Sequence, residues 1–234
     1  LSSRRKSGVL PPTFGIDNVN GIEVTAPYYW NIAPNRDATI SPTVMSKRGV
    51  DLGAEFRYLE ADYLGELRGN FMPGDKLRDM NRWGYSLTHS GTIRTGLDYV
   101  GALGLSLSLN RVSDDNYWRD FTRVSPGLTQ RLLPNDLSVT WSSGYLSTSI
   151  RMLKWQTLQD VTSPIVPPYD RMPQLAMRYA RVNINGFDMS VDADATRFNS
   201  DSNLTGQANG NRAFTALEIS RPWVSSAGFI TPKL

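Results

Sequence analysis

Apolar and polar residues alternate along most of this chain. Between residues 21 and 32, every even-numbered residue from Ile22 to Ile32 is apolar, and most of the residues between them are polar. Successive side chains of a β-strand point to opposite faces, so this pattern predicts a strand with one apolar face. An earlier strand is expected in residues 4–15, which makes this one the second.

The same alternation recurs in segments of about ten residues and predicts about twelve or thirteen strands in all. After the two opening strands, the segments are residues 37–47, 50–60, 62–72, 82–91, 96–111, 136–144, 145–157, 172–181, 186–198 and 212–220, with one more beginning in 226–234. We find no helical segment, so the expected fold is all-β and antiparallel.

The connections between the expected strands differ in length in a regular way. Links of a few residues, such as 33–36 and 182–185, alternate with longer links rich in Asp, Asn, Arg, Pro and Gly. The longer links are residues 73–81, 112–135, 158–171 and 199–211. Short turns at one end, long loops at the other and ten-residue alternating strands are typical of a transmembrane β-barrel. A soluble β-sandwich also alternates and is the alternative fold.

Proline interrupts the first two expected strands, at Pro11 and Pro12 in one and at Pro27 in the other. Proline has no backbone N–H to donate to a ladder, so it is confined to edges, strand starts and bulges. The sequence therefore predicts weak pairing where these two strands meet.

Composition narrows the class of protein further. The chain has 234 residues, no cysteine and a formal net charge of +3. It is thus one large or two small domains without disulfides or thiolate metal sites, and it is too weakly basic to indicate nucleic-acid binding. No apolar run approaches the roughly 18 residues that a membrane-spanning helix needs, which excludes a helical membrane protein. The N-terminus lacks the apolar core of a signal peptide, as in a mature protein or a fragment.

Three segments near the N-terminus are long and unusual in composition: RRKSGVLPP at 4–12, PYYWNIAPNRDATI at 27–40 and KRGVDLGAEFRYL at 47–59. They closely resemble the start of the barrel domain of the LptD family, the LPS-assembly outer-membrane proteins also called OstA or Imp. The close resemblance covers about residues 4 to 60. Beyond it the patterning is compatible, including PQLAMRYARV at 173–182.

The resemblance implies that the chain forms roughly the first half of a larger transmembrane β-barrel in the outer membrane of a Gram-negative bacterium. Residues 1–7 would be the linker from a periplasmic jellyroll absent from this sequence, and residues 8–234 the N-terminal half of the barrel. The implied function is assembly of lipopolysaccharide (LPS) at the membrane surface. The implied partners are LPS, membrane lipid, an LptE-type lipoprotein plug and a periplasmic LPS-transport bridge that docks on the jellyroll.

The resemblance also gives the prolines a role. In a closed barrel the first strand pairs with the last, and Pro11, Pro12 and Pro27 would weaken this region as a lateral gate through which LPS leaves sideways. The alternative is that the prolines only blunt a strand edge against aggregation.

Two further sets of residues have roles that follow from the expected faces. An Arg or Lys on a lipid face near mid-bilayer costs roughly 2 to 4 kcal/mol, so the charged faces are expected to line the lumen. The lumen candidates are Asp51, Glu55, Arg57, Asp62, Glu66, Arg68, Asn70, Asp188, Asp192 and Asp194. Such a lumen suits a sugar- and phosphate-bearing cargo, a structural salt-bridge network or a water-filled pore. The aromatic residues expected at the membrane interfaces are Tyr28, Trp30, Tyr58, Trp83, Tyr99, Trp141 and Trp155.

Catalytic and metal-binding chemistry find little support in the sequence. His89 and Ser90 are adjacent on an expected strand, so their side chains point to opposite faces and cannot act as a base and nucleophile together. The pairs Asp114–Asp115 and Asp192–Asp194 lack the dense spacing of a calcium loop and are expected to be solvated. We therefore expect no enzyme activity, cofactor or metal. A passive porin and a soluble carbohydrate-binding sandwich are the alternative functions.

Overall fold

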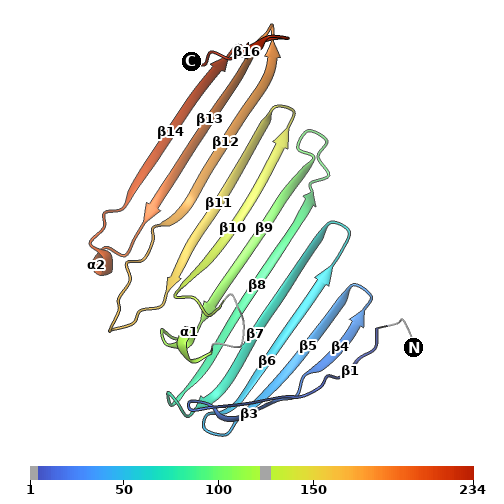
Figure 1. Ribbon diagram of the computed structural model, residues 1–234, viewed down its shortest axis with the longest axis vertical. Coiled ribbons are helices and arrows are strands. Elements are labelled where there is room, and N and C mark those ends of the chain that lie inside the picture. The colour runs from blue at the N-terminus through green and yellow to red at the C-terminus, as the bar shows by residue number, and fades with distance from the viewer. Residues whose placement is uncertain (1–4, 122–127) are drawn as a thin grey trace. The chain divides into compact units, whose positions relative to one another are not determined.

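The computed structural model describes residues 5–121 and 128–234 (Figure 1). Within them the strands form a 14-stranded sheet and a separate two-stranded hairpin, and neighbouring strands pair antiparallel. The sheet order is β1-β4-β5 and then each strand in turn to β14, while β2 pairs with β3 and β3 also pairs with β5. The expected all-β, antiparallel class is confirmed. The first four residues of the expected linker lie outside the described residues.

The chain divides into two compact units. Unit 1 comprises residues 1–91, 107–135 and 155–166, and unit 2 comprises residues 92–106, 136–154 and 167–234. The first strands are β1 (Gly8–Val9), β2 (Thr13–Asp17), β3 (Gly21–Thr25), β4 (Tyr28–Ala33), β5 (Arg36–Met45), β6 (Gly49–Leu59), β7 (Tyr63–Asp75), β8 (Met80–Arg94) and β9 (Ala102–Val112). The later strands are β10 (Leu132–Ser143), β11 (Leu146–Thr157), β12 (Asp170–Ile184), β13 (Phe187–Asn199), β14 (Gly210–Ser220), β15 (Trp223–Ser225) and β16 (Gly228–Ile230).

Proline breaks the first two expected strands, as predicted. The first strand is divided into β1 and β2 around Pro11 and Pro12, and the second into β3 and β4 at Pro27. Against β5 the two halves of the second strand keep one register, because Thr25 pairs with Thr43 and Tyr28 with Ile40.

Between the two broken strands the register shifts by one residue. Val9 pairs with Tyr28, so an unbroken ladder would place Thr13 opposite Val24, whereas Thr13 pairs with Thr25. An extra residue of this kind is a β-bulge, which disrupts the ladder locally.

Some expected boundaries are wrong. The strand expected over 96–111 begins only at Ala102, because residues 95–101 form a turn in which Gly96 and Gly101 have φ of 72° and 70°. Of the strand expected in 226–234, only β16 forms; it pairs with β15 in a short hairpin, and Lys233 bridges to Ser220. The expected long link 73–81 shortens to four residues, since β7 and β8 extend further than their alternation indicated.

Two single-turn helices were not expected from the sequence: α1 (Tyr117–Asp120) and α2 (Ser202–Thr205). Each lies in one of the long links. No helix in the described part of the chain has the length and apolarity to cross a membrane. The short links include a two-residue turn between β12 and β13, where Asn185 and Gly186 both have positive φ, as in a type I′ hairpin turn.

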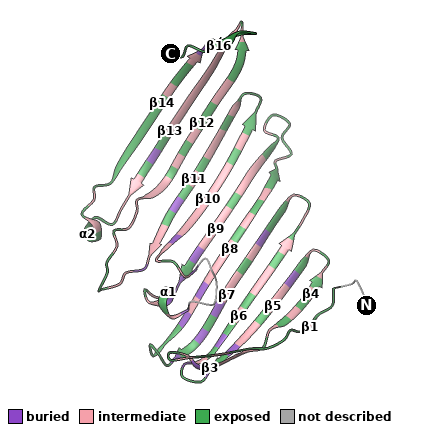
Figure 2. Ribbon diagram, viewed as in Figure 1, coloured by how far each residue is buried: buried purple, intermediate pink, exposed green. Residues whose placement is uncertain are grey.

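The buried apolar residues of unit 1 gather around the link between β9 and β10 (Figure 2). We call residues 113–121 and 128–131 the β9–β10 loop. The cluster comprises Met45, Met72, Val112, Tyr117, Phe121, Leu128, Leu133 and Leu158. Along the strands, by contrast, large apolar side chains such as Leu52, Leu67 and Phe71 are 42 to 49% exposed. The apolar face of these strands is therefore uncovered within unit 1.

Candidate functional site

The pairings at the start of the sheet contain three prolines, which have no backbone N–H to donate. The N–H of Leu10 donates to the carbonyl of Pro27 at 2.8 Å, and Pro27 has no N–H of its own. Pro11 and Pro12 lie between β1 and β2. We call this region, β1 to β4 with these three prolines, the proline seam.

A fourth proline weakens the next pairing, and the sequence analysis missed it. The N–H of Ala26 donates to the carbonyl of Pro42 in β5 at 3.1 Å. Hydrogen-bonded residues on antiparallel strands normally exchange two bonds, but Pro42 cannot donate the second. The alternation of residues 37–47 concealed this, because it treated Pro42 as one more apolar residue.

The described part of the expected linker lies along β4. The N–H of Asn31 donates to Ser7 Oγ at 2.9 Å, and its side-chain amide donates to the carbonyl of Arg5 at 3.1 Å. The Arg5 guanidinium lies 3.5 Å from the Asp37 carboxylate. Side chains thus supplement the few ladder bonds at this edge.

All lumen candidates of unit 1 except Asp62 share one face of β6 and β7. Pairing places Glu55 opposite Arg68 and Arg57 opposite Glu66. Arg68 Nε lies 3.0 Å from Glu55 and also contacts Glu66, while Arg57 donates to Asp37 at 2.8 and 3.0 Å. The pairs Glu55–Arg68 and Asp37–Arg57 join neighbouring strands and stabilise their pairing, whereas Glu66–Arg68 lies within β7. That this face lines a lumen stays a prediction.

Asn70 and Asp51 lie further along the same face, and Asp62 does not. Asn70 Nδ2 donates to Asp51 Oδ1 at 2.8 Å, and both residues are buried. Asp62 lies in the turn between β6 and β7, so no strand fixes the face to which it points. The sequence pattern placed Asp62 on a strand because this residue directly precedes the alternating residues of β7.

The β9–β10 loop folds onto this polar face. Tyr117 Oη donates a hydrogen bond to Asn70 Oδ1, and burial raises the pKa of the Tyr117 phenol. A Cβ on Gly84 would lie 2.7 Å from Tyr117 Oη and 3.1 Å from Leu128 Cδ1. Only glycine at position 84 therefore leaves room for the loop to pack this closely.

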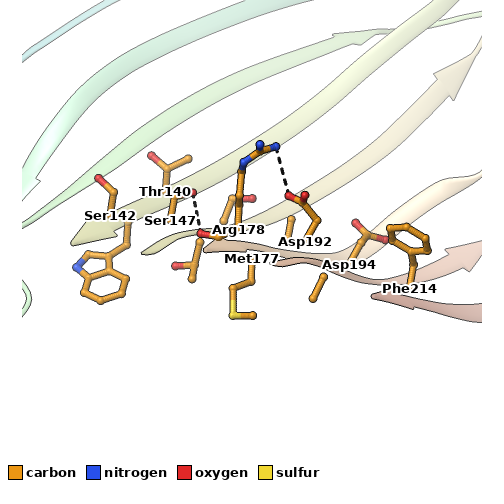
Figure 3. Close-up of a pocket in the computed structure, with 13 residues that line it drawn as sticks. Thr140, Ser142, Ser147, Met177, Arg178, Asp192, Asp194 and Phe214 are labelled. Carbon is orange, nitrogen blue, oxygen red and sulfur yellow. Dashed lines mark hydrogen bonds and ion pairs between the residues drawn. The ribbon is translucent and has the colours of Figure 1, made fainter. Parts of the chain in front are cut away.

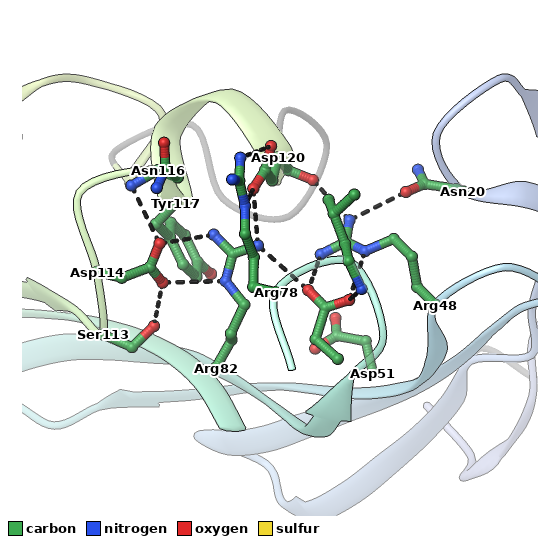
Figure 4. Close-up of polar contacts among 12 residues, drawn as sticks. Asn20, Arg48, Asp51, Arg78, Arg82, Ser113, Asp114, Asn116, Tyr117 and Asp120 are labelled. Carbon is green, nitrogen blue, oxygen red and sulfur yellow. Dashed lines mark hydrogen bonds and ion pairs between the residues drawn. The ribbon is translucent and has the colours of Figure 1, made fainter. Parts of the chain in front are cut away.

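Two fully buried arginines join the loop to the strands (Figure 4). Arg48, in the turn after β5, donates to both carboxylate oxygens of Asp75, at 3.1 and 2.5 Å. Its remaining contacts are the carbonyl of Asp120 at 2.8 Å and Asn20 Oδ1 at 3.0 Å. One guanidinium thus connects four segments of unit 1.

Arg82 of β8 is the second buried arginine. It donates to both oxygens of Asp114 at 3.0 and 2.9 Å, to Asp120 at 2.8 Å and to Asp75 at 3.2 Å. The ring of Phe121 lies 4.7 Å from the Arg82 guanidinium and 4.5 Å from that of Arg48. Asp114 is therefore not the solvated carboxylate expected from the sequence, because the loop brings it to Arg82.

We call these residues the arginine network; it comprises Arg48, Asp75, Arg78, Arg82, Asp114, Asp120 and Phe121. A buried charge is tolerated only when it is paired and hydrogen-bonded, and here each arginine meets that condition. Sequence reasoning missed the network, since its members are far apart in the chain. The one signal was the aromatic content of NYWRDF at 116–121 in an otherwise polar link.

In unit 2 the aspartates of β13 lie on one face with Arg178 of β12. Arg178 lies 3.4 Å from Asp192, and Asp194 accepts hydrogen bonds from Gln174 at 2.8 Å and Thr196 at 2.7 Å. Neither Asp192 nor Asp194 is a purely solvated carboxylate, in contrast to the expectation. Asp188 instead accepts the backbone N–H of Asn183 at 2.8 Å and stabilises the β12–β13 turn.

A hollow of about 550 Å³ lies at these strands (Figure 3). Besides the charged residues, hydroxyl side chains contribute to its lining. Ser147 and Ser149 share the face of Arg178 and Asp192, whereas Thr148 lies on the opposite face with Met177. Hydroxyls together with paired charges can hydrogen-bond a hydrated, sugar-bearing molecule as well as water.

The expected interfacial aromatics occupy different settings. Tyr58 and His89 lie on the apolar face, where Tyr58 Oη is 2.7 Å from His89 Nδ1, so His89 has a partner and Ser90 points away from it. Tyr99 is in the turn before β9 rather than on a strand. Trp141 donates through Nε1 to the carbonyl of Val100 at 2.6 Å. Tyr28 and Trp30 lie on β4 and are 42% and 49% exposed. A membrane interface for any of them stays a prediction.

Comparison with known proteins places the chain in a family. The family model LptD, described as LPS transport system D, matches residues 80–234. An LPS-assembly protein LptD of Albidiferax ferrireducens is 63% identical over 238 residues, covering 100% of this chain and 30% of that protein. The proteins of the same name from a Polaromonas species and Ralstonia nicotianae are 58% and 42% identical, again over 100% of this chain.

These relatives extend the likeness well past the opening segments. The sequence resemblance was close only over residues 4–60, whereas the relatives match throughout and the family model covers the later strands. The chain spans 28 to 30% of the length of these relatives. The chain belongs to the LptD family over its whole length.

Proposed function

We propose that this chain is part of an outer-membrane β-barrel in a Gram-negative bacterium, and that the whole protein assembles LPS at the cell surface. The observation that carries the proposal is the match of the entire chain to relatives named LPS-assembly proteins. The two faces of the sheet support it. One face carries cross-strand ion pairs, and the other exposes large apolar side chains that lipid would cover.

The proline seam is the proposed lateral gate. In lipid, every backbone polar group must be paired within the protein, so a ladder that lacks donors is the easiest to part. Pro11, Pro12 and Pro27 remove donors where the first two strands meet, and the one-residue register shift weakens the same place. LPS would cross the polar lumen with its sugars and leave sideways with its acyl chains in the membrane.

The remaining partners follow from the same proposal. A lipoprotein plug of the LptE type would occupy the lumen, and a periplasmic bridge would deliver LPS through a jellyroll joined near Arg5. The lumen candidates of unit 1 already pair with one another, so a cargo would meet a preformed salt-bridge network rather than free charges.

A reversible cross-link at the seam tests the gate. In the full-length protein that carries this segment, one cysteine replaces Thr13 and another is placed on the last strand of the barrel, and LPS at the cell surface is then measured. We expect oxidation to stop LPS arrival and reductant to restore it, because the first and last strands must separate for transport.

The matched control is a disulfide elsewhere in the sheet. Ala193→Cys with Thr215→Cys joins β13 to β14 at directly paired residues and leaves the seam free. Normal LPS arrival with the seam cross-linked would overturn the gate. It would leave the prolines as residues that blunt an edge.

A passive channel is the second candidate function, because a polar face with both charge signs also suits a water-filled pore. The β9–β10 loop argues against a wide pore, since it covers part of that face. Ion conduction by the reconstituted full-length protein, together with normal LPS at the surface of cells that lack it, would favour the channel.

A further inference from the structure

Two arginines lie on the apolar face of unit 2, at the end of β12–β14 where the short turns are. Arg181 pairs with Met189, two positions from the pair Tyr179 and Val191, so it shares the face of these apolar residues. Its guanidinium lies 5.1 Å from the centre of the Tyr145 ring. The apolar face of β12 therefore ends with the Arg181 guanidinium over the Tyr145 ring.

Arg221 repeats this arrangement directly after β14, which β13 separates from β12. The ladder between β13 and β14 ends where Ser220 pairs with Asp188, and Arg221 follows directly. The Arg221 guanidinium lies 5.0 Å from the Phe187 ring and 5.3 Å from the Trp223 ring. Stacking on aromatic rings orients a guanidinium without neutralising its charge.

Neither arginine has a carboxylate partner among the ion pairs of the described residues. On the polar face of the same strands, Arg178 pairs with Asp192 and Arg212 with Asp194. Arg181 and Arg221 are both exposed, as are the rings of Tyr145, Phe187 and Trp223. Unit 2 therefore presents two uncompensated positive charges on its apolar side.

The chemistry of this surface matches a phosphate at a membrane interface. The penalty for an arginine on a lipid face falls from roughly 2 to 4 kcal/mol at the midplane to about 0 to 1 near the interface. Short turns of outer-membrane barrels face the periplasm, so this end meets the inner leaflet. A guanidinium binds phosphate oxygens in a planar, two-pronged geometry, and aromatic rings favour the same depth.

We propose that Arg181 and Arg221, with Tyr145, Phe187 and Trp223, bind the phosphate groups of anionic phospholipids in the leaflet that faces the periplasm. This rests on the proposed outer-membrane location. It adds a lipid-binding surface distinct from the seam and from the polar face.

Lipid retention tests the surface. The full-length protein is purified in detergent, incubated with mixed micelles containing phosphatidylglycerol or phosphatidylcholine, and bound lipid is counted by native mass spectrometry. For Arg181→Gln with Arg221→Gln we expect bound phosphatidylglycerol to fall about tenfold, because each cation near a membrane surface contributes to anionic-lipid binding. Phosphatidylcholine binding should not change.

Arg178→Gln is the matched control. It removes one arginine from the same strand, on the side opposite to Met177 (Figure 3), and should leave phosphatidylglycerol retention unchanged. Lysine at positions 181 and 221 should restore most of the binding, which separates charge from altered folding.

Several outcomes would overturn the proposal. The first is that the double variant retains as much phosphatidylglycerol as the unchanged protein. The second is that Arg178→Gln loses as much bound phosphatidylglycerol as the double variant. The third is that, with LPS micelles as the probe, the double variant loses bound LPS instead of phospholipid. Surface LPS is measured in the same strains. Normal LPS arrival with unchanged lipid retention would reject this inference alone, whereas a protein extracted without detergent would reject the membrane location itself.

Discussion

Among single residues, those of the arginine network explain how the β9–β10 loop stays packed against the strands. The Phe121 ring lies 4.5 Å from the guanidinium of Arg48 and 4.7 Å from that of Arg82, and both arginines are at most 1% exposed. Each guanidinium donates to loop and strand acceptors at once. The loop is therefore held by charges that cannot return to water unless it leaves the strands.

Removing one of these arginines should release the loop. Arg82→Met leaves Asp75, Asp114 and Asp120 without their buried partner, and breaking a buried pair in this way costs about 3 to 5 kcal/mol. We expect backbone hydrogen exchange in residues 114–121 of the full-length protein to accelerate strongly. Arg212→Met is the control, since Arg212 is largely exposed and its pair with Asp194 is worth at most about 1 kcal/mol. Equal exchange in the two variants would contradict this role.

Loop packing should also depend on alkaline pH through Tyr117. Burial raises the pKa of this phenol above its ordinary value of 10.0, so the docked loop favours the protonated form. The contribution to docking is full below the pKa of the released tyrosine and is lost as pH rises through and beyond it. Exchange in residues 114–121 should accelerate above about pH 10.

Tyr117→Phe serves as the control for this titration. It should lack that pH step while showing faster exchange at neutral pH, because Asn70 Oδ1 loses its donor. A step of the same size in the variant would assign the pH dependence to another group.

At the scale of elements, Pro42 makes β5 part of the weakness that begins in the proline seam. The carbonyl of Ala26 lacks the donor that any other residue at position 42 would supply. The weakness therefore extends from the first two strands into the third.

Restoring that donor should strengthen the pairing. For Pro42→Ala in the full-length protein we expect the β3–β5 pairing to become more stable by about 0.5 to 1.5 kcal/mol. Hydrogen exchange should then be slower at the new amide of residue 42 than at the neighbouring amides. The amount of LPS at the cell surface should fall. Pro34→Ala, in the turn between β4 and β5, is the control and should change neither. Stronger pairing with normal LPS arrival would mean that this part of the weakness plays no role in transport.

The sequence predicted elements better than it predicted contacts. Alternation is local, so the strands and their breaks at Pro11, Pro12 and Pro27 could be read from it. The turn at 95–101 was missed because Leu97 and Tyr99 continue the alternation while glycines on both sides bend the chain. Arg48, Arg82 and Asp114 meet only after the β9–β10 loop folds back, and no local pattern reports such a contact.

At the scale of the whole molecule, the strand order runs from β1 to β14, and the chain spans 28 to 30% of the length of the relatives named above. In lipid an unpaired strand edge is costly, which is why spanning sheets close. We therefore expect the 234-residue chain alone to give no stable conductance in planar bilayers and to aggregate on refolding. The full-length protein should refold under the same conditions. A stable pore from the isolated chain would favour the passive channel.

The prolines divide the opening strands into two separate contacts. β1 is joined to β4 at two residue pairs, whereas β2 is joined to β3 at five pairs and by its own hairpin turn. The first contact can be lost while the second persists, because the prolines and the register shift uncouple them. If the seam is the proposed gate, its separation would then be graded rather than all-or-none, and the width of the opening would set how many acyl chains pass side by side.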